Sequence, residues 1–312
     1  MNKVYDVLVV GGGIAGLSAS ICTSTEGFST IVVDAGKFGG QAGTASLIEN
    51  LIGFPNGVCG KELLDNSIRQ ANKFGVILKG DFHIVNIKRD EDVFISTNAD
   101  GNEIISKTIV LALGQEYKKF DINSLDKFIG KGVSYTSPIV TQDYSDKTVS
   151  VIGGANSAGQ ASVFLSQCLN CNVNLIVRGS SLENSMSHYL YQKIYKIPNI
   201  KVFFDTEVTE CIGDEHLEEI VIKTEQGIFN IKSDELFILI GSSPKTEWLK
   251  DFVNLDQDGF IITDENLKAC EGVFSIGDVR SNSIKRVSCA IGEGGRVVKG
   301  IRARINQTLT KS

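Results

Sequence analysis

A glycine-rich turn near the N-terminus has the residue types and the spacing that bind a diphosphate. Gly11, Gly13 and Gly16 form a Gly-x-Gly-x-x-Gly pattern directly after the apolar run at residues 7–10. Such glycines allow a tight turn, a close approach of the backbone to a pyrophosphate, and close packing of a helix whose positive N-terminus faces the phosphates. Asp34 ends the next apolar run, where a carboxylate accepts hydrogen bonds from a ribose 2′-hydroxyl and repels a 2′-phosphate. The pattern predicts a site for an adenosine dinucleotide that lacks the 2′-phosphate.

A second copy of this pattern begins at residue 149 and reads Gly153-x-Ala155-x-x-Ala158. Ala155 stands where the middle glycine lets the backbone approach a pyrophosphate, and its methyl group fills that space. The following strand ends at Arg178 and not at an acid, which favours NADPH over NADH, with lowered affinity. A different nucleotide, a second flavin or an empty pocket are the alternatives. The candidate residues of this second site are Gly153, Gly154, Ala155, Asn156, Ser157, Ala158 and Arg178.

The elements around the two turns predict the fold class. In each copy a β-branched run, typical of a strand buried on both faces, leads through the turn into a helix of small residues and then into a second strand. This β-α-β order indicates parallel sheets. The fold class is therefore α/β, with two doubly wound three-layer (Rossmann-like) nucleotide-binding domains. Strand-like runs at 92–97 and 108–114 predict an antiparallel meander that returns to a buried strand.

Two polar linkers, at residues 115–119 and 241–244, place the second domain inside the first. We expect one nucleotide-binding domain over residues 1–116 and 242–312, and a second, inserted nucleotide-binding domain over residues 117–241.

Composition excludes several classes of protein. The chain has 312 residues, a formal charge of −6 and 42% hydrophobic residues, which excludes a disordered chain. It has no block of Lys and Arg, so we expect no nucleic-acid partner. Without a signal-like start or a run of roughly 20 apolar residues, we expect no membrane association and a cytoplasmic location. The seven scattered cysteines are expected to be free thiols, and no spacing of His and Cys predicts a metal site.

Further motifs resemble those of one family, the low-molecular-weight thioredoxin reductases, which are FAD-dependent pyridine nucleotide-disulfide oxidoreductases. These motifs are Gly39-Gly40-Gln41, the stretch at 49–55 and Gly277-Asp278 with the strand before it, and the resemblance covers nearly the whole chain. It implies FAD in the first domain, NADPH in the inserted domain and a homodimer. The FAD-binding residues implied by the motifs are Gly11, Gly13, Ile14, Ala15, Gly16, Asp34, Ala35, Gly40, Gln41, Asn50, Ala112, Gly114, Gly277, Asp278, Arg286 and Val287.

The chain departs from that family at the redox-active Cys-x-x-Cys. Counted without gaps, the two cysteine positions fall on Thr136 and Ile139, and the acid that follows them falls on Val140. Neither Thr nor Ile can carry a disulfide, so we expect no thioredoxin reduction by the family's mechanism. The chain resembles a subgroup that lacks the cysteine pair. Only Arg178 remains of the family's signature for the 2′-phosphate, and Glu183 would repel phosphate.

The remaining cysteines offer weaker candidates for chemistry. Cys168 and Cys171 have redox-motif spacing, but they close a helix and precede a strand, which is the wrong edge of a doubly wound sheet. Cys289 follows a segment that lies against the flavin in the family, so it is a weak candidate for a catalytic thiol. Cys59 lies in a glycine-rich loop and is expected to be exposed.

The sequence thus predicts an FAD-dependent oxidoreductase in which flavin passes electrons to an unknown acceptor. One alternative is a ferredoxin-linked or two-flavin oxidoreductase that does not use NADPH, with ferredoxin as an electron-transfer partner. The others are a ferredoxin–NADP reductase and a non-enzymatic flavin or nucleotide sensor.

Overall fold

The computed structural model describes residues 3–45, 48, 50–122, 124–135 and 144–309. The chain divides into two compact units, unit 1 (Met1–Glu116 with Ser243–Ser312) and unit 2 (Tyr117–Ser242). The second break lies one residue later than the boundary expected from the sequence. At the breaks, the short strands β7 (Glu116–Tyr117) and β16 (Ser242–Ser243) pair as a two-stranded sheet.

Unit 1 is built on a parallel sheet whose central strands end in fully buried runs of β-branched and leucine residues. The strand order is β17-β18-β6-β1-β2-β3, and only β17 joins its neighbour antiparallel. The strands are β1 (Val4–Val10), β2 (Thr30–Val33), β3 (Ile77–Lys79), β6 (Glu103–Leu111), β17 (Lys268–Cys270) and β18 (Val273–Ser275).

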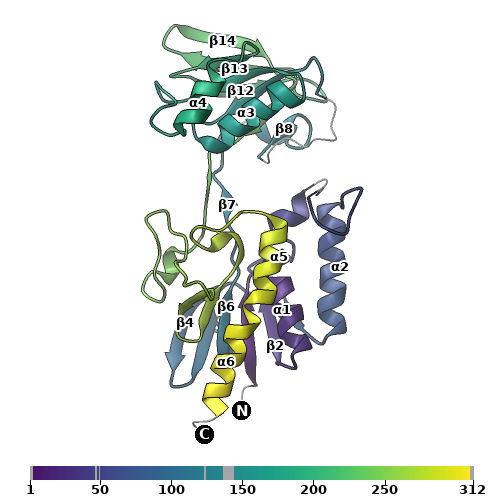
Figure 1. The fold of residues 1–312 in the computed structure, drawn as a ribbon, viewed down its shortest axis with the longest axis vertical. Helices are drawn as coiled ribbons and strands as arrows, with labels where there is room; N and C mark the ends of the chain where they lie inside the picture. The colour runs from purple at the N-terminus through teal and green to yellow at the C-terminus, as the bar shows by residue number, and fades with distance from the viewer. Residues whose placement is uncertain (1–2, 46–47, 49, 123, 136–143, 310–312) are drawn as a thin grey trace. The chain divides into compact units, whose positions relative to one another are not determined.

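Helices cover one face of this sheet and a β-meander covers the other (Figure 1). The helices are α1 (Ile14–Thr25), α2 (Gly60–Lys73), α5 (Val287–Arg296) and α6 (Val298–Leu309), and the meander strands are β4 (Ile84–Asp90) and β5 (Val93–Asn98). Strand β5 pairs antiparallel with β6, as the predicted meander requires. Short 3-10 turns complete the unit: η1 (Gln41–Thr44), η3 (Glu247–Leu249) and η4 (Gly277–Val279).

Unit 2 repeats the three-layer plan around its own parallel sheet. The strand order is β11-β10-β9-β15-β8, and every pairing in it is parallel. The strands are β8 (Val133–Ser134), β9 (Thr148–Ile152), β10 (Asn172–Ile176), β11 (Ile200–Phe203) and β15 (Glu235–Ile238). Helices α3 (Asn156–Cys168) and α4 (His188–Ile194) pack on one face.

The other face of the unit 2 sheet carries an antiparallel sheet, which is an addition to the predicted β-α-β plan. Its strands are β12 (Glu207–Ile212), β13 (Glu219–Thr224) and β14 (Gly227–Lys232), and the 3-10 turn η2 (Leu125–Phe128) packs with them. Among the helices of the described residues, none is both long enough and apolar enough to cross a membrane.

Candidate functional site

The first glycine-rich turn is held by backbone contacts that leave no room for side chains. Gly11 has a φ of +113°, and a Cβ atom there would lie 2.2 Å from the carbonyl oxygen of Ala112. A Cβ atom at Gly16 would lie 1.9 Å from the carbonyl oxygen of Gly11. These two glycines let β1 turn sharply and let α1 begin directly against the turn.

Gly13 differs from Gly11 and Gly16 because no atom of the described residues lies close to the position of its missing side chain. It is the N-cap of α1, and the nearest atom to a Cβ there would be the Cα of Gly40, at 3.9 Å. Among the residues that the structure describes, no side chain caps the first turn of α1. The positive end of the helix therefore faces open space, and this cradle fits a diphosphate group.

Asp34 lies just beyond β2, beside this cradle. Its Oδ2 accepts a hydrogen bond from the backbone N–H of Gly12 at 2.7 Å, and its Oδ1 accepts one from Gly36 at 2.9 Å. These two bonds fix the half-buried carboxylate in place. A carboxylate has about four acceptor positions, so it can still accept bonds from ribose hydroxyls.

A polar network on the far side of the turn joins segments that are distant in the sequence. The Nε2 of Gln41 donates to the backbone oxygen of Gln115 at 2.5 Å, and the Nε2 of Gln115 donates to Oδ2 of Asp278 at 3.4 Å. Gly277, with a φ of +73°, packs on the start of α1, since a Cβ there would lie 2.9 Å from the Cβ of Ala15. Gln115, which no sequence pattern marks, thus joins the predicted residues Gln41 and Asp278, and Gly277 joins them to the start of α1.

The electrostatic setting of Asp278 is unusual for a carboxylate. Burial raises the pKa of Asp278 above its ordinary value, and the charge of Glu293 raises it further, whereas Lys285 and the hydrogen bond from Gln115 lower it. Burial conversely lowers the pKa of Lys285 against the pull of Asp278 and other nearby carboxylates. A polar ligand group that replaces lost water suits such a site.

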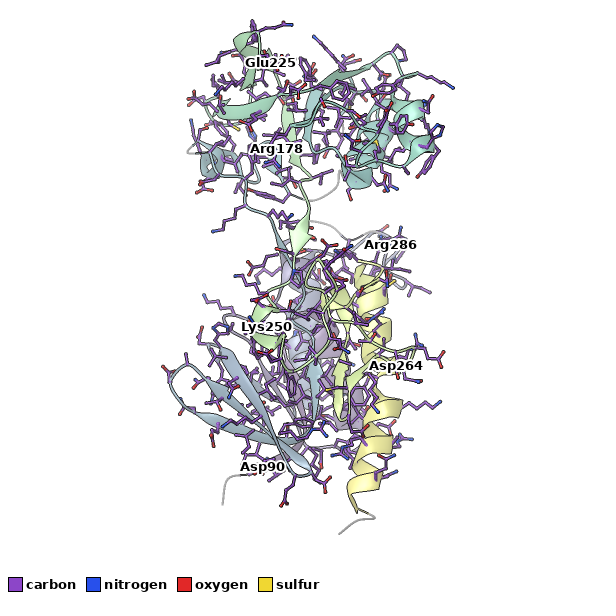
Figure 2. The ribbon with its side chains drawn as sticks, turned by 90° about the vertical axis from the view of Figure 1, so that its left-hand side faces the viewer. Asp90, Arg178, Glu225, Lys250, Asp264 and Arg286 are labelled. Atoms are coloured by element: carbon purple, nitrogen blue, oxygen red, sulfur yellow. The ribbon has the colours of Figure 1, made fainter. Side chains whose placement is uncertain are left out.

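Unit 2 has a cavity of about 970 Å³ at the carboxyl ends of its parallel strands, lined by Gly153, Gly154 and Arg178. This is the edge at which open α/β sheets bind ligands. Arg178, labelled in Figure 2, is exposed, and Lys118 and Lys119 also line the cavity. Glu183, expected to repel a phosphate here, is not among the lining residues.

The second turn repeats the backbone of the first, with a methyl group added. Ala155 is the N-cap of α3 with a φ of −98° and a ψ of −179°, close to the −77° and −176° of Gly13 in unit 1. A serine-rich loop holds the turn, because Ser185 Oγ donates to the oxygen of Gly154 at 2.8 Å. The Oδ1 of Asn156 accepts from the N–H and the Oγ of Ser187 at 2.8 and 3.0 Å. The Oδ1 of Asn156 is therefore already used in hydrogen bonds within the protein.

A chain with two glycine-rich turns of the nucleotide-binding type can be compared with known protein families. Residues 5–294 match the sequence profile of the pyridine nucleotide-disulphide oxidoreductases. The chain belongs to this family. The resemblance to thioredoxin reductases and the predicted α/β fold class are both confirmed. Members are flavin-dependent oxidoreductases that bind FAD and typically NADPH, and thioredoxin reductase-like members are typically homodimers.

Individual relatives place this oxidoreductase among the thioredoxin reductase-like members. The "34.2 kDa protein in rubredoxin operon" of Clostridium pasteurianum is 32% identical over 297 residues, which is 94% of each chain. The thioredoxin reductase of Borreliella burgdorferi is 30% identical, over 94% of this chain and 90% of its own. The crystal structure of thioredoxin reductase from Streptococcus pyogenes has a TM-score of 0.87 and 25% identity, and the match covers 98% of this chain and 100% of that one.

Other predicted site residues of this oxidoreductase are not hydrogen-bonded to the Asp278 network within the described part of the chain. Asn50 is exposed in the loop that continues to Pro55, and Arg286 is the exposed N-cap of α5 (Figure 2). No hydrogen bond of the described residues joins either side chain to the Asp278 network. Val287 instead packs against the core on the helix side of unit 1.

The cysteines of this oxidoreductase are free thiols. Cys59 is exposed as predicted, and Cys289 is half-buried on α5. Cys168 is exposed at the end of α3, while Cys171 is buried and its thiol donates to the oxygen of Tyr144 at 3.3 Å. Within the described ranges, no group of three or more His, Cys, Asp or Glu side chains could hold a metal ion. The positions of the family's redox cysteines, Thr136, Ile139 and Val140, lie outside the described residues.

Proposed function

We propose that this chain is an FAD-dependent oxidoreductase that passes electrons through the bound flavin, without a protein disulfide, to an acceptor other than thioredoxin. The observation that supports FAD binding most directly is the cradle at Gly13, where an uncapped helix N-terminus faces open space beside a fixed carboxylate. Bound FAD supplies hydride and one-electron transfer, and the protein supplies binding and orientation.

Each part of unit 1 has a proposed task toward FAD. The N–H groups of the first turn of α1 bind the diphosphate, and Asp34 accepts hydrogen bonds from the adenosine ribose. Asp278 and Gln41, joined through Gln115, hold the polar chain between diphosphate and flavin ring. The other residues proposed to contact FAD are Gly11, Ile14, Ala15, Gly16, Ala35, Gly40, Asn50, Ala112, Gly114, Gly277, Arg286 and Val287.

The cavity of unit 2 is proposed to bind NADPH with lowered affinity. Arg178, with Lys118 and Lys119, supplies positive charge for a 2′-phosphate. The methyl group of Ala155 keeps the diphosphate away from the N-terminus of α3.

A second candidate function is an oxidoreductase reduced by an electron-transfer protein such as ferredoxin, with a second flavin or no ligand in unit 2. Ala155 favours this candidate, since it weakens the site that a nicotinamide cofactor needs. The Clostridium pasteurianum relative, named for its place in a rubredoxin operon, is consistent with an electron-transfer partner.

An anaerobic titration of the purified holoprotein with NADPH, followed by the visible absorption of the flavin, separates the candidates. Bleaching that is stoichiometric with NADPH supports the first. Bleaching by dithionite and by reduced ferredoxin, but not by NADPH, supports the second. Bound FAD that turns over with no donor indicates a sensor. A purified protein that neither contains nor takes up FAD refutes all of these, and thioredoxin reduction at the rate of flavin reduction refutes the proposed acceptor.

A further inference from the structure

Helix α5 directs a largely buried carboxylate, that of Glu293, at the turn that carries Asp278. The Oε2 of Glu293 accepts a hydrogen bond from the backbone N–H of Gly277 at 2.6 Å, and its Oε1 pairs with the guanidinium of Arg280. Gly277 immediately precedes Asp278, and Arg280 follows it by two residues. The Glu293 side chain therefore binds the chain both before Asp278, at Gly277, and after it, at Arg280.

This ion pair differs from the others in the molecule by its burial. The side chains of Arg280 and Glu293 are 18% and 12% exposed, and no other ion pair of the described residues has both partners below one fifth. Surface ion pairs contribute little to stability, and a buried pair is often no more stabilising than apolar residues of the same size. The Nε–H of Arg280 is also buried, and no described residue accepts a hydrogen bond from it. Stability alone therefore does not account for this arrangement.

The location of the Arg280–Glu293 pair, beside the turn that carries Asp278, explains the arrangement better than stability does. Gly277 has a φ of +73°, which glycine adopts without strain, but the same freedom leaves the turn into η4 less restricted by sterics than at any other residue type. A charged acceptor at 2.6 Å gives a stronger and more directional hold on the Gly277 N–H than a neutral one. Asp278 is the next residue. A contact that fixes the backbone at Gly277 therefore also fixes the position of the Asp278 Cα, from which the carboxylate side chain extends.

We propose that Glu293 is the positioning residue that sets Asp278 for FAD, with Arg280 holding Glu293 in turn. The inference rests on the proposed function, because it takes Asp278 as an FAD contact. Glu293 acts on Asp278 through the turn, and its charge also raises the pKa of Asp278, so its effect on FAD depends on the presence of the Asp278 carboxylate.

A double-mutant cycle on the purified protein tests this dependence. The dissociation constant of FAD is measured by fluorescence titration of the apoproteins of the wild type, Glu293→Ala, Asp278→Ala and the double variant. We expect Glu293→Ala to weaken FAD binding about 10- to 100-fold, and less than about threefold when Asp278 is already replaced. Glu293→Gln keeps an acceptor for Gly277 but loses the ion pair, so it should restore binding to within about tenfold of the wild type.

Two further measurements separate positioning from a loss of fold. Urea unfolding of each apoprotein reports stability, and the visible circular dichroism of bound FAD reports how the flavin is held. Arg296→Ala is the matched control, because Arg296 lies on the same helix and bonds the Glu265 backbone. It should leave both the affinity for FAD and the dichroism unchanged.

The outcomes are distinct. A wild-type protein that binds no FAD refutes the proposed function, and with it the premise of this inference. The positioning role alone is refuted if the wild type binds FAD and Glu293→Ala lowers the affinity for FAD equally with Asp278 present and with Asp278 replaced by Ala. The positioning role is also refuted if Glu293→Gln, folded like the wild type, binds FAD no better than Glu293→Ala.

Discussion

Gly13 and Ala155 hold equivalent places in the two units, and exchanging their side chains tests why the two sites differ. Both are N-caps in extended conformations that any residue adopts, so neither exchange strains the backbone. In Gly13→Ala the nearest neighbour of the new methyl group is the Cα of Gly40 at 3.9 Å, an ordinary contact. The apoprotein should therefore be as stable as the wild type, or more stable by up to about 1 kcal/mol.

The new methyl group instead fills the space in front of α1. Charge-assisted hydrogen bonds contribute about 1.5–3 kcal/mol each. Two such bonds between the diphosphate and the first turn of α1 would contribute about 3–6 kcal/mol. If displacement of the diphosphate halves that contribution, FAD binding weakens by about 1.5–3 kcal/mol. The dissociation constant of FAD should then rise about 10- to 150-fold. The reverse change, Ala155→Gly, should tighten NADPH binding by about tenfold or more.

Fluorescence titration of the apoprotein measures the first change, and anaerobic flavin bleaching against NADPH concentration measures the second. Gly16→Ala is the control for a change that the fold cannot accept, because its Cβ would lie 1.9 Å from the oxygen of Gly11. It should lose stability as well as FAD. A Gly13→Ala protein that binds FAD within threefold of the wild type would refute the reasoning.

Three other changes test single side chains. Asp34→Asn should weaken FAD binding about tenfold in a fluorescence titration, since the amide accepts through one oxygen only; unchanged affinity would remove Asp34 from the site. Burial and the nearby Glu210 raise the pKa of the Cys211 thiol from 9.0 to about 11. The unfolded chain ionises first, so stability should fall by about 1.9 kcal/mol between pH 9 and 11, and urea unfolding of Cys211→Ala should lack this part of the slope. The pKa of Asp6 is lowered because hydrogen bonds from Lys107 and Ser29 outweigh its burial. This stabilisation is present above the ordinary pKa of Asp6, 3.8, and is lost as the pH falls through the lowered pKa. Asp6→Asn should therefore be less stable than the wild type at pH 7, and the difference should shrink as the pH is lowered below 3.8; a difference that does not shrink in acid would contradict this origin.

The sequence was sufficient to predict the layers and turns that local pattern controls. Buried strands, small-residue helices and glycines with steric requirements all leave a signal within about 30 residues, so both β-α-β units and the turn at Gly11 could be predicted. The antiparallel sheet of unit 2 was missed, although the two runs at 219–224 and 227–232 flank a two-residue connection typical of a hairpin.

The side-chain network of the site could not be predicted in the same way. Gln115 reaches Asp278 across 163 residues, and Glu293 reaches Gly277 from a different helix. Contacts of this kind depend on how elements pack, and no periodicity marks them. A glutamate among glycines in the stretch 292–295 was visible in the sequence, but nothing local shows that its carboxylate is buried.

The insertion of unit 2 into unit 1 has a consequence for chain entropy. Both ends of the inserted segment meet in the β7–β16 pair, so folded unit 2 spans the gap in unit 1 much as a short loop would. Were unit 2 to unfold, unit 1 would have to close a flexible loop of about 126 residues. With about 0.6 kcal/mol for each doubling of loop length, and about five doublings from a four-residue turn, the closure costs about 3 kcal/mol. A mutation that melts unit 2 therefore loosens unit 1 as well, even when it touches no residue of unit 1.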